Sequence, residues 1–218
     1  MKIDPRPDLS LYLVTDRGSS RGRAAADIVR EAVAGGVTCV QLRDKHSPTR
    51  ELIAEARRLM ALLRPAGIPL IINDRLDVAL AVQADGVHLG QQDMDIADAR
   101  LLAGPAMIIG ISVESLADAV RAEHQGADYL GISPVFATPT KTDTAAPLGL
   151  EGVARIRRAV ALPLVGIGGI KADNAAAVIA AGADGVAVVS AIVAADCPRT
   201  AAAELKGRIA QAREGRMI

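Results

Sequence analysis

Basic residues that could hold phosphate groups follow one of the short apolar segments of the sequence. Arg43 and Lys45 stand two positions apart directly after such a segment. Side chains two residues apart project to the same side of an extended chain, and a guanidinium beside an ammonium suits a diphosphate. A solvated charge pair in a surface loop is the alternative interpretation. Matched polar residues after the neighbouring apolar segments favour the diphosphate.

Two aspartates hold comparable positions after the next apolar segments. Asp74 follows one of these segments and Asp93 follows the next one along the chain. If the segments are adjacent strands, the two carboxylates could meet and share a hard cation with phosphate oxygens. Mg²⁺ is the predicted metal because it typically accepts one or two carboxylates together with substrate phosphates and water. Alternatively, Asp74 caps the following helix and Asp93 is a solvated loop residue.

A glycine-rich segment in the second half of the chain predicts a separate phosphate site. Residues 166–170 read G-I-G-G-I, and Val189 with Ser190 ends a later apolar segment. Together they resemble a cup in which backbone amides and a helix start receive a monophosphate. Glycines that only make a tight turn are the alternative. No G-x-G-x-x-G motif follows the first apolar segment, which argues against a dinucleotide-binding fold.

The longest connection, residues 134–149, could supply further groups for an anionic ligand. It places Thr138, Thr140, Lys141 and Thr142 within a few residues of each other, which gives three hydroxyls and one ammonium. A solvated loop rich in threonine and proline is the alternative. We expect an exposed loop on the active face rather than a boundary between domains.

The elements that must position these residues follow a regular alternation. Short β-rich apolar runs alternate with segments of helical periodicity, as expected for parallel strands that are covered on both faces. We therefore predict an α/β fold in which residues 1–218 form a single (β/α)₈ TIM barrel, whose active site lies at the carboxyl ends of the strands. The predicted strands are 11–15, 38–43, 70–73, 86–89, 107–112, 129–133, 164–168 and 185–189.

The turns that join helices to strands repeat a glycine or an Ala-Asp pair, at residues 34–37, 83–87, 126–129 and 182–186. Glycine can end a helix in a left-handed conformation and release the chain into the next strand. We assign the carboxylates of these turns a structural role on the face opposite the active site. Helix N-caps are expected at Ser47, Ser115 and Asp173.

Composition excludes several classes of partner. The 25 basic and 25 acidic residues cancel, so no overall field would draw the protein to nucleic acid or to an anionic membrane. Aromatic residues are nearly absent, which disfavours a stacking platform for single strands. We expect Cys39 and Cys197 to be buried free thiols, and we see no signal peptide or membrane span, so a cytoplasmic protein is expected. His46, His88 and His124 receive no catalytic assignment.

The ordered set of motifs resembles the thiamine phosphate synthase family over nearly the whole chain. Each motif is weak by itself, but their shared order on successive strand–helix units is specific. The motifs are Q-L-R-D-K (41–45), I-N-D-R (72–75), H-L-G-Q-Q-D (88–93), G-I-S-V (110–113), T-P-T-K (138–141), V-G-I-G-G-I (165–170) and V-S-A (189–191).

The resemblance implies a transferase that joins hydroxymethylpyrimidine diphosphate to a thiazole phosphate and releases pyrophosphate. It implies a magnesium ion held by Asp74 and Asp93, and catalytic roles for Arg43, Lys45, Ser112 and Lys141. The residues that it implies for the pyrimidine diphosphate are Gln41, Arg43, Lys45, Asn73, Ser112 and Lys141, with Leu42 and Asp44 in the same segment. Those that it implies for the thiazole phosphate are Thr138, Thr140, Gly168, Val189 and Ser190, with Pro139 between the threonines.

Two rival functions share parts of this pattern. A thiazole tautomerase of similar fold needs the monophosphate cup but not a metal-bound diphosphate site, and the joint presence of Arg43, Lys45, Asp74, Asp93 and Lys141 favours the synthase. A non-catalytic binder of thiamine phosphate could keep the same pocket without turnover. The sequence leaves open the oligomeric state, the carboxylation and tautomer of the thiazole, and closure of the 134–149 loop.

Overall fold

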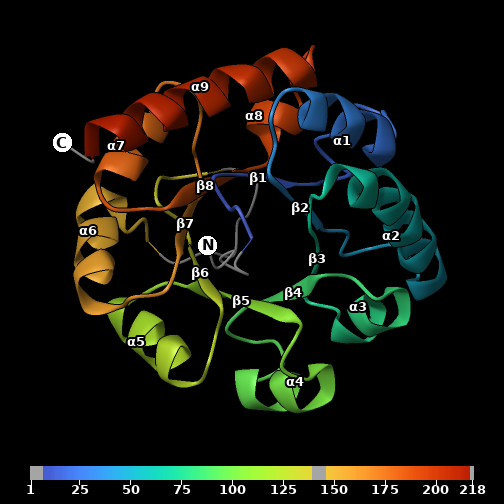
Figure 1. Cartoon of the computed structure of the whole chain (residues 1–218), viewed down its shortest axis with the longest axis horizontal. Coiled ribbons are helices and arrows are strands. Elements are labelled where there is room, and N and C mark those ends of the chain that lie inside the picture. Colours follow the sequence, from blue (N-terminus) through green and yellow to red (C-terminus); the bar gives the residue numbers. More distant parts are fainter. Residues whose placement is uncertain (1–6, 139–145, 217–218) are drawn as a thin grey trace, which may run out of the picture.

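The computed structural model, which describes residues 7–138 and 146–216, is a closed barrel of parallel strands paired in sequence order from β1 to β8. Helices form a ring around the strands (Figure 1). The predicted (β/α)₈ fold is confirmed. The strands are β1 Leu11–Val14, β2 Cys39–Leu42, β3 Leu70–Asn73, β4 Gly86–Leu89, β5 Ile108–Val113, β6 Tyr129–Ile132, β7 Leu164–Ile167 and β8 Gly185–Val188.

Each predicted strand overlaps an observed one, and the boundaries differ by one residue or not at all at either end. The helices are α1 Ala25–Ala34, α2 Thr49–Leu63, α3 Leu76–Val82, α4 Ile96–Ala103, α5 Leu116–His124, α6 Gly149–Ala159, α7 Ala175–Ala180, α8 Ser190–Val193 and α9 Pro198–Arg216, with a 3₁₀ turn at Arg64–Ala66.

The core has two parts because successive side chains of each strand point to opposite faces. The larger cluster lies between the strands and the helices, where Leu13, Val40 and Leu130 are fully buried. A smaller cluster fills the barrel interior and contains Tyr12, Tyr129 and other buried side chains of the strands. Polar residues at interior positions therefore lie directly above or within a packed layer rather than in a pore.

The turns on the face opposite the active site use the aspartates as the sequence predicts. The side chains of Asp85 and Asp184 accept hydrogen bonds from the first backbone amides of β3 and β7, and Asp128 accepts from the second amide of β5, at 2.7–2.9 Å. The Thr38 hydroxyl accepts in the same way from the amide of Leu11 at the start of β1. These groups satisfy amides at strand starts, so their role is structural.

Glycine has a positive φ in three of these turns, at Gly36, Gly126 and Gly182. In the fourth, Gln83 takes the left-handed conformation with φ of 55°. Of the predicted helix caps, Ser115 is confirmed because its hydroxyl accepts from the amide of Asp118.

Two predicted caps and one predicted burial are wrong. Pro48 rather than Ser47 stands at the N-cap of α2, because the Ser47 hydroxyl is turned back to Asp44. Asn174 occupies the position expected for Asp173. Both cysteines are free thiols, but Cys197 is exposed while Cys39 is buried. Cys197 stands in the connection before α9, which does not cover it. No described helix is long and apolar enough to cross a membrane.

The Asp184 carboxylate offers a test of the structural role of these turns. It bonds the buried Leu164 amide at 2.9 Å and the Arg157 guanidinium at 3.1 Å. Asp184→Ala leaves that amide without this acceptor, so we expect the free energy of unfolding to fall by about 1–3 kcal/mol. Urea denaturation measures the loss, with Glu204→Ala on α9 as a surface control. A loss no larger than that of the control would contradict the assignment.

Candidate active site

A cavity of about 590 Å³ opens at the carboxyl ends of the strands. It is lined by residues that follow most of the strands, so side chains distant in sequence meet around one opening. Polar and apolar groups share its wall. The predicted site residues that line it are Gln41, Arg43, Lys45, Asn73, Asp74, Asp93, Ser112, Thr138, Gly168, Val189 and Ser190.

The alternation of β2 and the residues after it decides which members of the Q-L-R-D-K motif reach this cavity. Gln41, Arg43 and Lys45 line it, as the spacing predicts. Leu42 and Asp44 point the other way, where both line a second cavity beside α1 and α2. Leu42 is buried in the cluster between strands and helices. The structure therefore does not bring these two residues to the barrel mouth.

Three further predicted residues, Pro139, Thr140 and Lys141, lie outside the described residues. Their substrate roles remain predictions. Thr138, at the described end of the same loop, does line the cavity.

The two predicted metal ligands interact on one side of the mouth. Burial, together with the neighbouring Asp93 carboxylate, raises the pKa of Asp74 to about 6, while Lys45 and Arg43 act in the opposite direction. Asp74 does not cap α3, whose N-cap is Arg75 without a side-chain cap bond. Asp93 accepts a hydrogen bond from the Gly90 amide at 2.6 Å. Two neighbouring carboxylates that repel each other suit a hard divalent cation, which would neutralise both.

Close packing of β7 against the loop after β6 requires glycine on the other side of the cavity. Gly168 has φ of 101°, and a Cβ there would lie 2.7 Å from the Cβ of Pro134. A Cβ on Gly169 would lie 2.6 Å from the Ala137 carbonyl oxygen. Ser190 begins α8 nearby and lines the same cavity. The predicted cup thus combines a glycine turn with a helix start.

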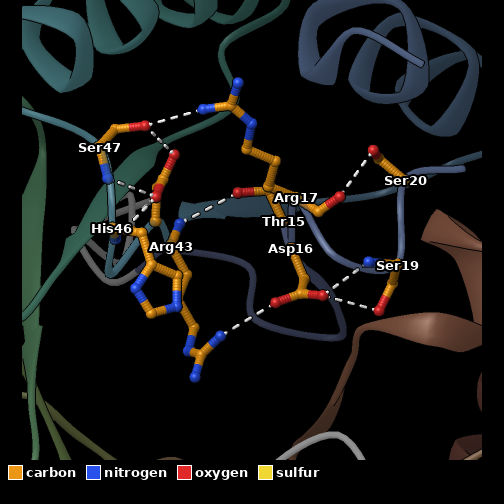
Figure 2. A network of polar contacts seen from close by, with 9 residues as sticks. Thr15, Asp16, Arg17, Ser19, Ser20, Arg43, His46 and Ser47 are labelled. Atoms are coloured by element: carbon orange, nitrogen blue, oxygen red, sulfur yellow. Dashed lines mark hydrogen bonds and ion pairs between the residues drawn. The ribbon is translucent and has the colours of Figure 1, made fainter. Parts of the chain in front are cut away.

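An ion pair that the sequence does not reveal holds Arg43. Its guanidinium contacts the Asp16 carboxylate at 3.1 Å, and both side chains are about four-fifths buried, with exposures of 21% and 19%. Asp16 is in turn fixed by the amide and the hydroxyl of Ser19, at 2.8 and 2.7 Å. The Arg43 amide donates to the Thr15 hydroxyl at 3.0 Å (Figure 2). Residues after β1 therefore position a residue after β2.

The loop after β2 is held from its outer side by a second set of contacts. Asp44 accepts from the amides of His46 and Ser47, and from the Ser47 hydroxyl at 2.7 Å. Arg17 donates to the same hydroxyl at 3.0 Å (Figure 2). These contacts give Asp44 a structural place behind the cavity wall.

The cavity wall also contains three polar side chains, His88, Tyr129 and Tyr12, to which the sequence assigned no role. His88 contacts the Ser112 hydroxyl at 2.9 Å and the Tyr129 hydroxyl at 2.8 Å. Tyr129 contacts Tyr12 at 2.9 Å. Each stands at an interior position of its strand. Only the alternation of inward and outward side chains along the strands could have identified these residues from the sequence.

Comparison with known proteins identifies the family. A family model described as thiamine monophosphate synthase matches residues 11–192. Thiamine-phosphate synthase of Albidiferax ferrireducens is 58% identical over 198 residues, which are 91% of this chain and 90% of the relative. The chain belongs to the thiamine monophosphate synthase family. The thiamine-phosphate synthase of Chloroflexus aurantiacus is 54% identical over an alignment that spans 98% of this chain and 99% of that relative.

A solved structure agrees with this membership. Thiamine phosphate pyrophosphorylase from Pyrococcus furiosus matches with a TM-score of 0.87 and 44% identity, over 94% of this chain and 98% of that one. The predicted thiamine phosphate synthase, a transferase of thiamine biosynthesis on a TIM barrel, is therefore confirmed.

The Asp74–Asp93 pair should lower the free energy of unfolding of the metal-free protein at high pH. Because the folded pKa of Asp74 lies near 6, above the ordinary 3.8, folding favours its protonated form, and stability falls as pH rises through that range. Asp74→Asn should raise the free energy of unfolding by about 1 kcal/mol near pH 8, a value reduced for solvent screening, and by little near pH 4. Thermal unfolding at both pH values measures this. An equal effect at both would contradict the charge explanation.

The Asp16–Arg43 pair predicts how a variant binds anions. Through salt-screened solvent, Asp16 repels a pyrophosphate ion roughly 7 Å away by about 1 kcal/mol, whereas a loose arginine must give up about 2 kcal/mol of rotamer entropy on binding. Ordering exceeds repulsion, so we expect Asp16→Ala to bind inorganic pyrophosphate about threefold to tenfold more weakly. Asp16→Asn, which keeps an acceptor without the charge, should bind at least as well as the wild type. Calorimetric titration decides, and tighter binding by Asp16→Ala would reject positioning.

Proposed function

We propose that the protein condenses 4-amino-2-methyl-5-hydroxymethylpyrimidine diphosphate with a thiazole phosphate, with or without a carboxylate, to give thiamine phosphate and pyrophosphate. One observation carries this proposal. Cationic and paired acidic side chains occupy one side of the cavity, while a glycine turn and a helix start occupy the other. Two different phosphate groups can therefore face each other across one opening, which is the arrangement that a coupling reaction needs.

The diphosphate side would stabilise the departing charge. Arg43 and Lys45 line this side, with Asn73 beside them. Asp74 and Asp93 would hold Mg²⁺, which supplies charge neutralisation to the diphosphate oxygens when bound. A departing pyrophosphate gains negative charge at the bond that breaks, so preorganised cations lower the barrier. Lys141, predicted from the sequence, would add a further cation.

The reaction needs no protein nucleophile. The electron-rich aminopyrimidine can support a positive charge on its exocyclic carbon once the C–O bond to the diphosphate breaks. Pyrophosphate leaves with the electron pair of that C–O bond, and the thiazole nitrogen then donates its own electron pair to the carbon. The protein contributes position and electrostatic stabilisation.

The thiazole side would hold the second substrate in line with that carbon. Thr138 and Gly168 line this side, and Val189 with Ser190 would receive the monophosphate. Thr140 and Pro139 would extend this wall. Because both cysteines are free thiols, we place the enzyme in a reducing cytoplasm.

Pyrophosphate release tests the proposal and separates its rivals. Both substrates and Mg²⁺ are mixed with the protein, and pyrophosphate and thiamine phosphate are measured with and without a chelator. A synthase releases both products only when the pyrimidine diphosphate and the thiazole phosphate are present together. A tautomerase would convert the thiazole phosphate alone, and a binder would release nothing. Full activity in the chelator would remove the role given to Asp74 and Asp93.

Kinetic variants should separate the two sides of the cavity. We expect Arg43→Ala or Lys141→Ala to lower kcat by about a hundredfold, because charge on the leaving group loses a stabilising cation. Ser190→Ala should mainly raise KM for the thiazole phosphate, by about tenfold. Steady-state rates with each substrate varied in turn provide the measurement, with the exposed Arg158→Ala on α6 as the control. Unchanged turnover in the Lys141 variant would reject its assigned role.

A further inference from the structure

A continuous series of hydrogen bonds crosses the barrel interior along the wall of the cavity. The Gln41 amide nitrogen donates to the Tyr12 hydroxyl at 3.0 Å. Tyr12 and Tyr129 share a hydrogen bond of 2.9 Å. Tyr129 meets His88 Nδ1 at 2.8 Å, and His88 Nε2 meets the Ser112 hydroxyl at 2.9 Å. We call these five residues the interior hydrogen-bond chain.

The barrel is shaped to contain this chain. Tyr12 and Tyr129 are each 1% exposed, and their rings meet edge to face. A Cβ on Gly110 would overlap the Tyr129 ring, and one on Gly131 would lie 3.0 Å from His88 Cε1. Glycines on β5 and β6 thus leave room for the phenol and the imidazole. All five residues line the cavity, although the two phenols are almost fully buried, and Gln41 and Ser112 are the ends of the series.

The hydrogen bonds of this chain have a single direction. Burial raises the pKa of both phenols well above the usual value, so each phenol keeps its proton and can donate one hydrogen bond. Tyr12 accepts from Gln41 and donates to Tyr129 rather than to the weakly accepting thiol of Cys39. Tyr129 then donates to Nδ1 of the imidazole. The proton of a neutral His88 is left on Nε2, which donates to Ser112.

This direction decides what the two ends can offer a ligand. The nitrogen of the Gln41 amide is engaged inside the barrel, so its carbonyl is the end left for the cavity. The Ser112 oxygen accepts from His88, so its own proton is free to point to a ligand. Reversal at one end would require every bond of the chain to reverse.

We propose that the two phenols and the imidazole are positioning groups that select an aminopyrimidine over its oxo analogue. Their chain makes the Gln41 carbonyl an acceptor for an amino group and the Ser112 hydroxyl a donor to a ring nitrogen. In the oxo analogue a carbonyl replaces the amino group, and it would face the Gln41 carbonyl without a proton between them. This inference rests on the proposed function, because it concerns the pyrimidine substrate.

The histidine tautomer tests the direction without any turnover. The polypeptide contains three histidines, so labelling histidine with ¹⁵N gives few signals. The signals that are missing in His88→Asn belong to His88. At about pH 8, where a histidine is ordinarily neutral, we expect long-range ¹H–¹⁵N correlation to show the proton on Nε2 of His88. A proton on Nδ1, or on both nitrogens, would overturn the proposal.

Removal of one hydroxyl tests the selectivity. Tyr129→Phe keeps the ring in its glycine-lined space but interrupts the chain between Tyr12 and His88. We expect the wild type to bind the amino diphosphate more tightly than the oxo analogue, and the ratio of the two affinities to fall about tenfold in the variant. KM for the thiazole phosphate should not change. An unchanged ratio would reject the positioning role.

Two controls separate this role from loss of stability. Ile71→Val alters the same interior cluster without touching the hydrogen bonds, so it should lower the melting temperature but leave the affinity ratio unchanged. Tyr12→Phe, which interrupts the chain at another link, should reproduce the effect of Tyr129→Phe. A wild-type protein that releases no pyrophosphate would reject the proposed function, while the tautomer would still decide the direction of the chain. If the wild type couples the two substrates but His88 carries its proton on Nδ1, the proposed function stands and only this inference is rejected.

Discussion

Closure of the parallel strands into one barrel is the constraint on which the rest of the structure depends. Because all strands run in the same direction, their carboxyl ends converge on one rim. Alternation of side chains along each strand then determines which residues of that rim face inward. Arg43 reaches the cavity for this reason and Leu42 does not, although they are neighbours in sequence.

The same alternation explains what the sequence could and could not predict. The strands were visible as apolar runs, and the meeting of Asp74 with Asp93 followed from their places after adjacent strands, β3 and β4. Asp44 was assigned to the substrate site because it belongs to the Q-L-R-D-K motif. The alternation of side chains after β2 points it away from the barrel mouth, into the second cavity. Residue spacing alone would have separated it from Arg43.

Other features depend on contacts that no local pattern records. Asp16 was visible as a polar residue after the first strand, but its pairing with Arg43 joins two strand ends 27 residues apart. Tyr12 and Tyr129 read as ordinary strand residues, and their contact spans 117 positions. His88 likewise lies within an apolar run. Only a closed barrel brings these groups to one interior, so composition and periodicity could not pair them.

Charge balance at the rim links these contacts to the chemistry. Among the described residues that line the cavity, Arg43, Lys45 and Lys171 are opposed by Asp74, Asp93 and Glu114. Asp16 behind the wall offsets part of the charge of Arg43. The described lining therefore has no surplus of positive charge with which to meet a diphosphate and a monophosphate together. Further cations must enter with the substrates or from the rest of the loop after β6, and a divalent ion between the two aspartates would convert their mutual repulsion into attraction for phosphate oxygens.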